Sequence, residues 1–338
     1  MRKLGGVLAL LLILCSTTGA FYTQKLLNQS LFSEASSYVV EPGASVKKIA
    51  SQISPPGHFL NQIIVELYGR WVTRIDTIKA GEFRIKNGAN TKSFFATLII
   101  GKVIEHTVTI PEGWVFQEML DKLSSLDRLN HPADDYQKNI LTENLGVEAG
   151  KSLEGLFFPD TYFYTDGMNG TEILYQAYLN MQIQLAEAWA SRASALSSEL
   201  QIKTPYEALI LASIIEKETG IAGERRKISG VFHNRLRIGM MLQTDPTVIY
   251  GLGDEFNGNL RRVDLETDTP YNTYTRYGLP AGPIALPGRL SLDAAVNPEA
   301  TSALYFVADG YGGHNFSDTL EQHNQAVADY LRILRASH

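Results

Sequence analysis

The N-terminus carries the longest uncharged apolar run of the chain. Residues 4–20 contain no charged side chain, and Phe21 and Tyr22 extend the run. Its length approaches the ~20 residues that cross a bilayer, and aromatic side chains favour the membrane interface. The pattern predicts an uncleaved transmembrane anchor over residues 1–22, with the basic end in the cytoplasm and the rest of the chain exported. A cleaved signal peptide is the alternative, with small residues at 18–20 as its cleavage site.

The region after this run alternates between short strand and helix patterns. Residues 23–37 are polar and lack a period, which predicts a short stalk. Residues 38–105 contain strand patterns at 38–40 and 81–85 and helix patterns at 46–53 and 91–100. Such alternation predicts a small α/β module.

The pattern of residues 106–338 predicts a larger region that mixes strands and helices. The patterns in order are a strand at 108–110, a helix at 115–123, an aromatic segment at 154–162, helices at 170–196, 204–219 and 229–239, a hairpin at 304–316 and a final helix capped by Asp318 and Glu321. The strand–turn–helix pattern of residues 108–123 also occurs at 38–53, which indicates either an internal repeat or two common turns. The predicted fold class is α+β.

The helix predicted over residues 204–219 stands out because apolar residues occur nearly all the way round it. Thr204 and Glu207 have the spacing of a capping box, and Pro205 suits the first helical position. A helix that is apolar on every side is buried in the protein. Charged residues in its last turn therefore need an explanation.

Glu216 and Glu218 are the carboxyl groups of that last turn. They lie about 200° apart around the helix, so they face opposite sides. Burial and the helix C-terminus both disfavour a carboxylate and raise its pKa toward the range of about 6–7 that suits a general acid. A buried ion pair with Arg225 or Arg235 is the alternative. The residues alone do not choose between these two interpretations, or between the two glutamates.

Two segments that combine polar and aromatic residues follow the buried helix. Residues 241–251 place Gln243 and Asp245 before an apolar stretch, and residues 271–274 read Tyr-Asn-Thr-Tyr. Amide and carboxylate groups bind sugar hydroxyls, and aromatic faces stack on sugar rings. The segments predict a glycan-binding cleft beside the glutamates. Asp245 is alternatively a turn or cap residue.

Charge and composition exclude several functions. The chain has 338 residues and a net charge of −6, without the basic patch that phosphate recognition needs, so no nucleic-acid partner is expected. The single cysteine, Cys15, lies in the apolar run and leaves no disulfide or cysteine chemistry for the remaining residues. Neither the His-Glu-x-x-His zinc motif nor the Gly-x-Ser-x-Gly elbow occurs. A peptidase is therefore disfavoured, and no metal or other cofactor is expected.

Motifs spread over essentially the whole chain resemble the YceG-like family. They are Glu216-Lys217-Glu218-Thr219, Asn234-Arg235-Leu236, residues 242–248, Tyr271-Asn272-Thr273-Tyr274, Gly278-Leu279-Pro280, residues 154–162, and residues 307–310 with Gly313-His314. The resemblance implies an N-terminal transmembrane helix over residues 1–22, a stalk over 23–37, a small LysM-like α/β module over 38–105 and a mixed α+β transglycosylase catalytic domain with a lysozyme-like cleft over 106–338.

The resemblance also implies an activity. It implies an endolytic peptidoglycan lytic transglycosylase that cleaves the MurNAc–GlcNAc β-1,4 bond of glycan strands and leaves 1,6-anhydroMurNAc ends. Such an enzyme acts on nascent strands to terminate elongation, beside glycan polymerases. The expected place is the inner (cytoplasmic) membrane, crossed once, with the catalytic domain on the periplasmic side. A non-catalytic, membrane-anchored peptidoglycan-binding scaffold is the alternative.

Of the two glutamates, the resemblance selects Glu218 as the catalytic residue. One carboxyl then protonates the leaving oxygen and later accepts a proton. Gln243, Asp245, Asn272 and Tyr274 are the candidates for holding the sugar.

Overall fold

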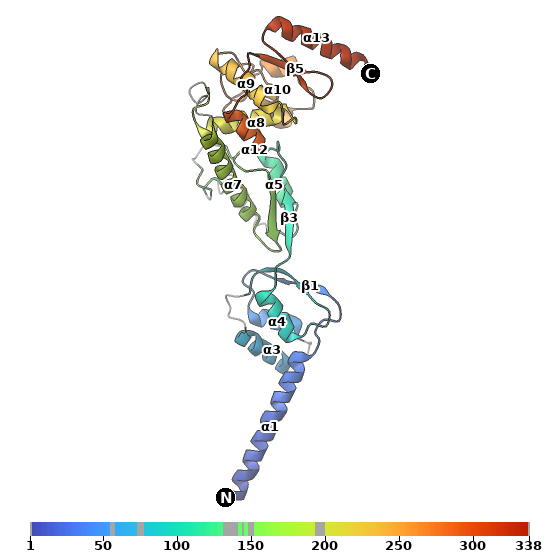
Figure 1. Ribbon diagram of the computed structural model, residues 1–338. Helices are drawn as coiled ribbons and strands as arrows, with labels where there is room; N and C mark the ends of the chain where they lie inside the picture. Colours follow the sequence, from blue (N-terminus) through green and yellow to red (C-terminus); the bar gives the residue numbers. More distant parts are fainter. Residues whose placement is uncertain are drawn as a thin grey trace. The chain divides into compact units, whose positions relative to one another are not determined.

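The protein is described here from a computed structural model, which describes residues 2–54, 58–72, 78–130, 141–143, 145–147, 152–192 and 200–336. The chain divides into two compact units, and both contain helices and strands (Figure 1), which confirms the α+β class. The first unit comprises Met1–Thr107, Leu126–Asn130 and Phe163–Asn169, and the second comprises Val108–Ser125, His131–Tyr162 and Gly170–His338. The boundary falls within two paired strands, β3 (Glu105–Thr109) and β4 (Thr161–Thr165). The domain limits at 38–105 and 106–338 stay a prediction, because the first unit also takes in two later segments.

The first unit is built around a strand–helix–helix–strand sequence. Its elements after the N-terminal helix are β1 (Ser36–Val40), α2 (Val46–Ile53), α3 (Phe59–Val72), β2 (Gly81–Ile85) and α4 (Thr91–Ile100). β1 and β2 pair antiparallel, with Tyr38 opposite Phe83. Phe83, Phe94 and Leu98 lie in a core that the helices cover. The predicted strands and helices are confirmed, and α3 is an additional helix that the apolar pattern did not predict.

The helix α1 (Arg2–Asn28) is longer than the predicted anchor. It contains a stretch, Leu10–Asn28, that is long and apolar enough to cross a membrane by length and composition. The predicted stalk over residues 23–37 differs from what is observed. Its first residues continue α1, with Leu26 and Leu27 buried in the first unit, and its last residues belong to β1. The helix α1 therefore continues directly into the folded unit.

The second unit has the buried helix of the sequence pattern at its centre. Its remaining elements are α5 (Phe116–Ser124), α7 (Gly170–Ser191), α8 (Pro205–Glu218), α9 (Arg225–Arg237), α10 (Asp245–Leu252), the 3-10 helix η2 (Gly253–Glu255), α11 (Arg262–Glu266), α12 (Arg289–Val296), β5 (Tyr305–Ala308), β6 (His314–Ser317) and α13 (Leu320–Ala336). α8 packs against α7, α9, α10 and α12. The predicted helix at 170–196 ends at Ser191, and residues 193–196 lie outside the described residues.

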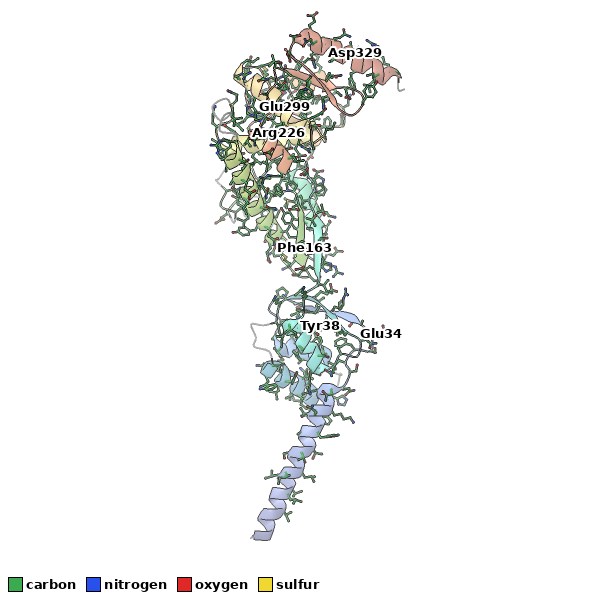
Figure 2. All side chains as sticks on the ribbon, viewed as in Figure 1. Glu34, Tyr38, Phe163, Arg226, Glu299 and Asp329 are labelled. Carbon is green, nitrogen blue, oxygen red and sulfur yellow. The ribbon has the colours of Figure 1, made fainter. Side chains whose placement is uncertain are left out.

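The backbone of α9 lies close to the backbone of the segment that precedes the C-terminal hairpin. The N–H of Glu299 donates to the carbonyl of Arg226 (2.9 Å), and the two residues are side by side in Figure 2. A Cβ on Gly230 would lie 2.5 Å from the carbonyl oxygen of Glu299. Gly230 is therefore required where α9 meets the segment before the C-terminal hairpin.

The C-terminal hairpin and helix follow the prediction with a one-residue change in the cap. β5 and β6 pair antiparallel, with Phe306 opposite Phe316. The predicted cap of Asp318 with Glu321 is wrong by one residue. The Thr319 hydroxyl accepts from the N–H of Gln322 (3.3 Å), and the Gln322 side chain accepts from the N–H of Thr319 (3.3 Å).

Candidate active site

The helix α8 forms for the reasons that its sequence suggests. Thr204 accepts a hydrogen bond from the N–H of Glu207 (3.2 Å), Glu207 accepts from the N–H of Thr204 (3.3 Å), and Pro205 occupies the first turn. Its side chains from Ala208 to Ile215 are all buried. The last turn then brings Glu216 and Glu218 to opposite sides of the helix.

Glu216 is a structural carboxylate. Its Oε1 accepts a hydrogen bond from the guanidinium of Arg225 (3.0 Å), and its Oε2 accepts from the N–H of Gly288 (2.9 Å). The side chains of Glu216 and Arg225 are only 5% and 7% exposed, so the two form a buried ion pair whose opposite charges compensate each other. Glu216 thus realises the buried ion pair that was the alternative explanation for charge in this turn, and Arg225 is its partner.

Glu218 lies in different surroundings, at the wall of a cavity. The described side chain that contacts it through a hydrogen bond is Thr244, whose hydroxyl donates to Oε1. Burial raises the pKa of Glu218 to about 7, against the opposing effects of the Thr244 hydrogen bond and of the positive charges of His314 and Arg235. A carboxyl with this pKa is protonated in a useful fraction of molecules near neutral pH and can act as a proton donor.

The turn before α10 presents Thr244 to Glu218. Gln243 has φ of 47°, the only positive φ at a non-glycine residue among the described positions. Such a conformation is strained for glutamine, and the N–H of Gln243 is held by the carbonyl of Thr273 (3.1 Å). Thr244 is the N-cap of α10, yet its hydroxyl makes no capping bond because it is directed to Glu218. Helix α10 therefore lacks a side-chain N-cap bond, and the Thr244 hydroxyl donates to the Glu218 carboxyl instead.

The four predicted sugar-binding residues do not all reach the cavity. Gln243, Asp245 and Tyr274 line it together with Glu218, and the Tyr274 hydroxyl donates to Asp245. Asn272 is 1% exposed, and its amide donates to the carbonyls of residues 264, 265 and 267 while its oxygen accepts from the N–H of Tyr274 (2.7 Å). Asn272 is therefore not among the residues that line the cavity, and its hydrogen bonds hold the loop that carries Tyr274.

The cavity beside Glu218 has a volume of about 430 Å³, within the range of small-molecule sites. One wall is the turn before α10, and the other is formed by β5 and α13. The lining residues are Glu218, Arg235, Leu242, Gln243, Thr244, Asp245, Tyr274, Tyr305, Phe306, Val307, Leu320, His323 and Val327. Apolar and aromatic faces together with a few polar groups are the surroundings that a sugar ring requires.

Arg235 joins the two walls. Its Nε donates to the carbonyl of Leu304 (2.6 Å) and its Nη1 to the carbonyl of Leu242 (2.6 Å). Its guanidinium also lies over the ring of Tyr305, 5.3 Å from the centroid, and Tyr305 stacks on His323 with centroids 5.1 Å apart. By residue type Arg235 was a candidate ion-pair partner, and no role at the cavity was predicted for it. Its place in the Asn-Arg-Leu motif, one helix after the glutamates, is the sequence signal for this role.

His314 ties the hairpin to the region after α8. Its N–H donates to Glu224 Oε1 (2.9 Å), and its Nδ1 lies 2.7 Å from Glu224 Oε2. Glu224 also accepts from the hydroxyl of Thr219, the C-cap of α8 (3.4 Å). Through these contacts the β6 strand is positioned relative to the end of α8 that carries Glu218.

A second buried carboxyl, Glu154, lies outside the cavity that Glu218 lines. It accepts hydrogen bonds from the N–H groups of Phe116 (3.0 Å) and Gly155 (3.2 Å) and from the hydroxyl of Tyr250 (3.2 Å). Burial raises the pKa of Glu154 to about 7. Three donors from three segments converge on it, so its carboxyl holds the start of α5 against α10.

Volume alone does not identify the site. A cavity of about 420 Å³ lies against the start of α8, but its lining contains neither a carboxylate nor an imidazole. The cavity at Glu218 combines a similar volume with a carboxyl whose pKa is raised, a hydroxyl donor and an arginine. Perturbed titratable groups in a concave site mark functional positions, so the Glu218 cavity is the candidate active site.

Comparisons with known proteins agree over most of the chain. The chain is 28% identical to a protein of Bacillus subtilis (strain 168) named endolytic murein transglycosylase, with 93% of this chain and 90% of that protein covered. It is 26% identical to a protein of the same name from Streptococcus pneumoniae serotype 2 (strain D39), over 95% of this chain, and spans 64% of that longer protein. A crystal structure of a yceG-like protein from Listeria monocytogenes is similar with a TM-score of 0.55 and 28% identity, over 86% of this chain and 98% of that one.

The match to the family profile covers both units. The sequence profile of the YceG-like family matches residues 38–329, which include every strand and helix from α2 to β6 and most of α13. The candidate active site lies entirely inside the matched range. The chain therefore belongs to the YceG-like family.

Proposed function

We propose that this protein is an endolytic murein transglycosylase, and that Glu218 is its catalytic acid and base. The observation that carries the proposal is a single carboxyl with a pKa raised to about 7, at the wall of a cavity large enough for sugar. The names of the relatives from Bacillus subtilis and Streptococcus pneumoniae support the same activity.

The proposed reaction cleaves the β-1,4 bond between MurNAc and GlcNAc without water. Protonated Glu218 donates its proton to the glycosidic oxygen while the C1–O bond breaks and positive charge develops at C1. The carboxylate then accepts the proton of the C6 hydroxyl of the same MurNAc, whose oxygen forms the new bond to C1. The products are a free GlcNAc hydroxyl and a 1,6-anhydroMurNAc end, and Glu218 regains its proton.

The other cavity residues have supporting roles in this proposal. Gln243 and Asp245 hold sugar hydroxyls, and Tyr274 orients Asp245 through its hydrogen bond. Asn272 is buried and positions Tyr274 by accepting a hydrogen bond from its backbone N–H. Arg235 keeps the two walls of the lysozyme-like cleft at their separation and places positive charge near the carboxylate formed in the first step.

The proposal includes the place of action. The helix α1 anchors the chain once in the cytoplasmic membrane, and its basic end keeps it oriented with both units on the outer side. The strand–helix–helix–strand order of the first unit, with β1 and β2 antiparallel, supports a LysM-like glycan-binding module. An anchored enzyme meets strands as they are made, which suits cutting of nascent strands beside the glycan polymerases.

The pH profile provides a prediction for Thr244. Because the first step needs protonated Glu218, cleavage should fall as pH rises through about 7. Thr244→Val removes a donor that stabilises the carboxylate, so the alkaline limb should move upward by roughly one pH unit. The measurement is kcat/KM for cleavage across pH, with Thr267→Val, an exposed threonine outside the cavity, as the matched control. An unchanged limb in Thr244→Val would show that this hydroxyl does not tune the acid.

The activity itself is tested with uncrosslinked glycan strands of defined length. The full chain, reconstituted in vesicles, is incubated with the strands, and the fragments are sized by mass spectrometry. An endolytic enzyme produces internal fragments of several lengths. If the strands bind to the vesicles and keep their full length, the scaffold alternative replaces the proposal.

A further inference from the structure

The helix α3 presents an apolar face that the first unit does not cover. Leu60, Ile64, Leu67 and Trp71 recur at intervals of four, three and four residues, which places them within a sector of about 60° on one side of the helix. Leu60 is 69%, Leu67 61% and Trp71 83% exposed. A stripe of this length with three strongly exposed apolar residues is a surface that needs a partner.

The opposite side of α3 faces the core of the unit. Asn61, Val65 and Gly69 are buried, and they lie about 130° around the helix from the exposed stripe. A Cβ on Gly69 would lie 2.7 Å from Phe95 and from Val46, so α3 is held closely against α2 and α4. The exposed stripe is therefore a fixed surface of a packed helix.

The anchor helix determines which partner lies near this stripe. The hydroxyl of Tyr22 in α1 donates to the side chain of Asn61 in the first turn of α3 (2.8 Å), and α3 lies beside the upper end of α1 in Figure 1. Leu26 and Leu27 are buried in the unit, so no spacer separates the anchor from it. Large apolar side chains that the structure describes in α1 before this point are exposed, among them Leu10, Leu12 and Phe21.

The length of the apolar run sets the level of Tyr22 in a bilayer. From residue 4 to Tyr22 an α-helix rises about 27 Å, close to the ~30 Å of the hydrocarbon layer. Tyr22 then stands at the membrane interface, where tyrosine is favoured. The hydrogen bond to Asn61 places the first turn of α3 at the same level.

We propose that α3 lies on the surface of the membrane that α1 crosses, with Leu60, Ile64, Leu67 and Trp71 inserted among the headgroups and the upper acyl chains. An apolar stripe with a tryptophan beside a polar flank is the composition of an interfacial helix, and the Glu66–Arg70 ion pair (2.8 Å) occupies that flank. The inference rests on the anchoring of α1 in the proposed function. Insertion of α3 gives the first unit a defined face toward the lipid. Anchoring by α1 alone would let the unit rotate about the helix axis.

The test measures contact of Trp71 with lipid in the full chain. The variant W114F/W189F leaves Trp71 as the only tryptophan, and it is reconstituted in phosphatidylcholine–phosphatidylglycerol vesicles with plain or brominated acyl chains. Bromine quenches tryptophan on contact, so we expect the fluorescence of Trp71 to fall at least about twofold in brominated vesicles. A matched control carries Y68W with all three native tryptophans replaced by Phe, since Tyr68 is on the side of α3 that packs on the core. Its fluorescence should change little.

A further variant separates this inference from the anchor. F21W, in the same tryptophan-free background, reports whether α1 is inserted. Quenching of F21W without quenching of Trp71 would overturn the α3 proposal and leave the anchor intact. Quenching of neither would reject the anchor and the α3 proposal together. Equal quenching of Trp71 and Y68W would show a unit that opens on the membrane, which contradicts a packed helix with one lipid-facing side.

Discussion

Replacing Glu218 with Gln is expected to reduce strand cleavage by roughly 10³-fold or more, because in the proposed mechanism this one carboxyl performs both proton transfers. Glutamine keeps the size of the side chain and an oxygen that accepts from Thr244, so the cavity should keep its shape. The measurement is the initial rate at which new chain ends appear on uncrosslinked glycan strands. A variant that cuts at the rate of the wild type would remove Glu218 from the mechanism.

The same variant should be more stable than the wild type above neutral pH. The pKa of Glu218 is about 7 in the folded chain and 4.5 as a free side chain, so the folded state binds more protons between these values. The stability penalty is absent below pH 4.5, grows as pH rises, and reaches about 3 kcal/mol above pH 7. Glutamine has no such penalty. Urea unfolding at pH 8 should therefore give Glu218→Gln a higher midpoint, which separates lost chemistry from lost fold.

Glu216→Gln is the matched control for the activity measurement, because it makes the same change two residues away on the same helix. Glu216 binds Arg225 and the N–H of Gly288, and it is not among the cavity-lining residues. At a temperature where the variant is folded, we expect its rate to stay within about tenfold of the wild type, as for a residue outside the chemistry. Equal loss of activity in both folded variants would contradict the separation of roles.

The larger effect of Glu216→Gln should appear in stability. The change leaves Arg225 charged and buried without its carboxylate, and breaking a buried pair on one side costs about 3–5 kcal/mol. The partly exposed carboxyl of Glu112, 3.9 Å from Arg225, recovers only part of that loss. Urea unfolding at neutral pH measures the effect as a lower midpoint.

A double variant tests the cause of that loss. Removing both charges with E216L/R225M replaces the pair by apolar side chains of similar size, which is often close to neutral for stability. The double variant should therefore be more stable than Glu216→Gln. If its loss of stability equals the sum of the losses in the single variants Glu216→Leu and Arg225→Met, the two residues do not act as a pair.

The sequence predicted the position and the burial of α8 well, because those properties are local. The Thr204–Glu207 capping box and Pro205 define its start, and the continuous apolar residues define its environment. The difference between Glu216 and Glu218 is not local. It arises from Gly288, 72 residues after Glu216, and from the turn at Thr244, which lies 26 residues after Glu218.

The arrangement of the candidate site likewise depends on contacts between distant segments. Asn272 was predicted as a sugar ligand from its residue type, and in the structure its amide binds the loop around it. The hairpin and the final helix were predicted, but nothing in their sequence indicates that β5 and α13 form a wall of the cavity at the end of α8. Arg235 was one of two candidate ion-pair partners, and its actual partners are the carbonyls of two distant segments. The strained φ of Gln243 has no signature in the sequence.

In the first unit the prediction missed α3 for a physical reason that bears on function. Its apolar residues occur on both the core side and the exposed side, so no single amphipathic face marks it as a surface helix. The residues predicted as a stalk begin as a continuation of α1, because the polar residues at 23–25 gave no sign that Leu26 and Leu27 are buried. Both differences concern the place where α1 joins the folded chain.

The central claim is that Glu218 catalyses cleavage without water, and the chemistry of the new chain ends tests it most directly. Strands are digested by the wild-type chain in water labelled with heavy oxygen, and the ends are analysed by mass spectrometry. We expect each new MurNAc end to be one water lighter than a reducing end and to carry no label, because the C6 oxygen of the same sugar closes on C1. Reducing ends that carry the heavy oxygen would contradict the account and make the enzyme a hydrolase.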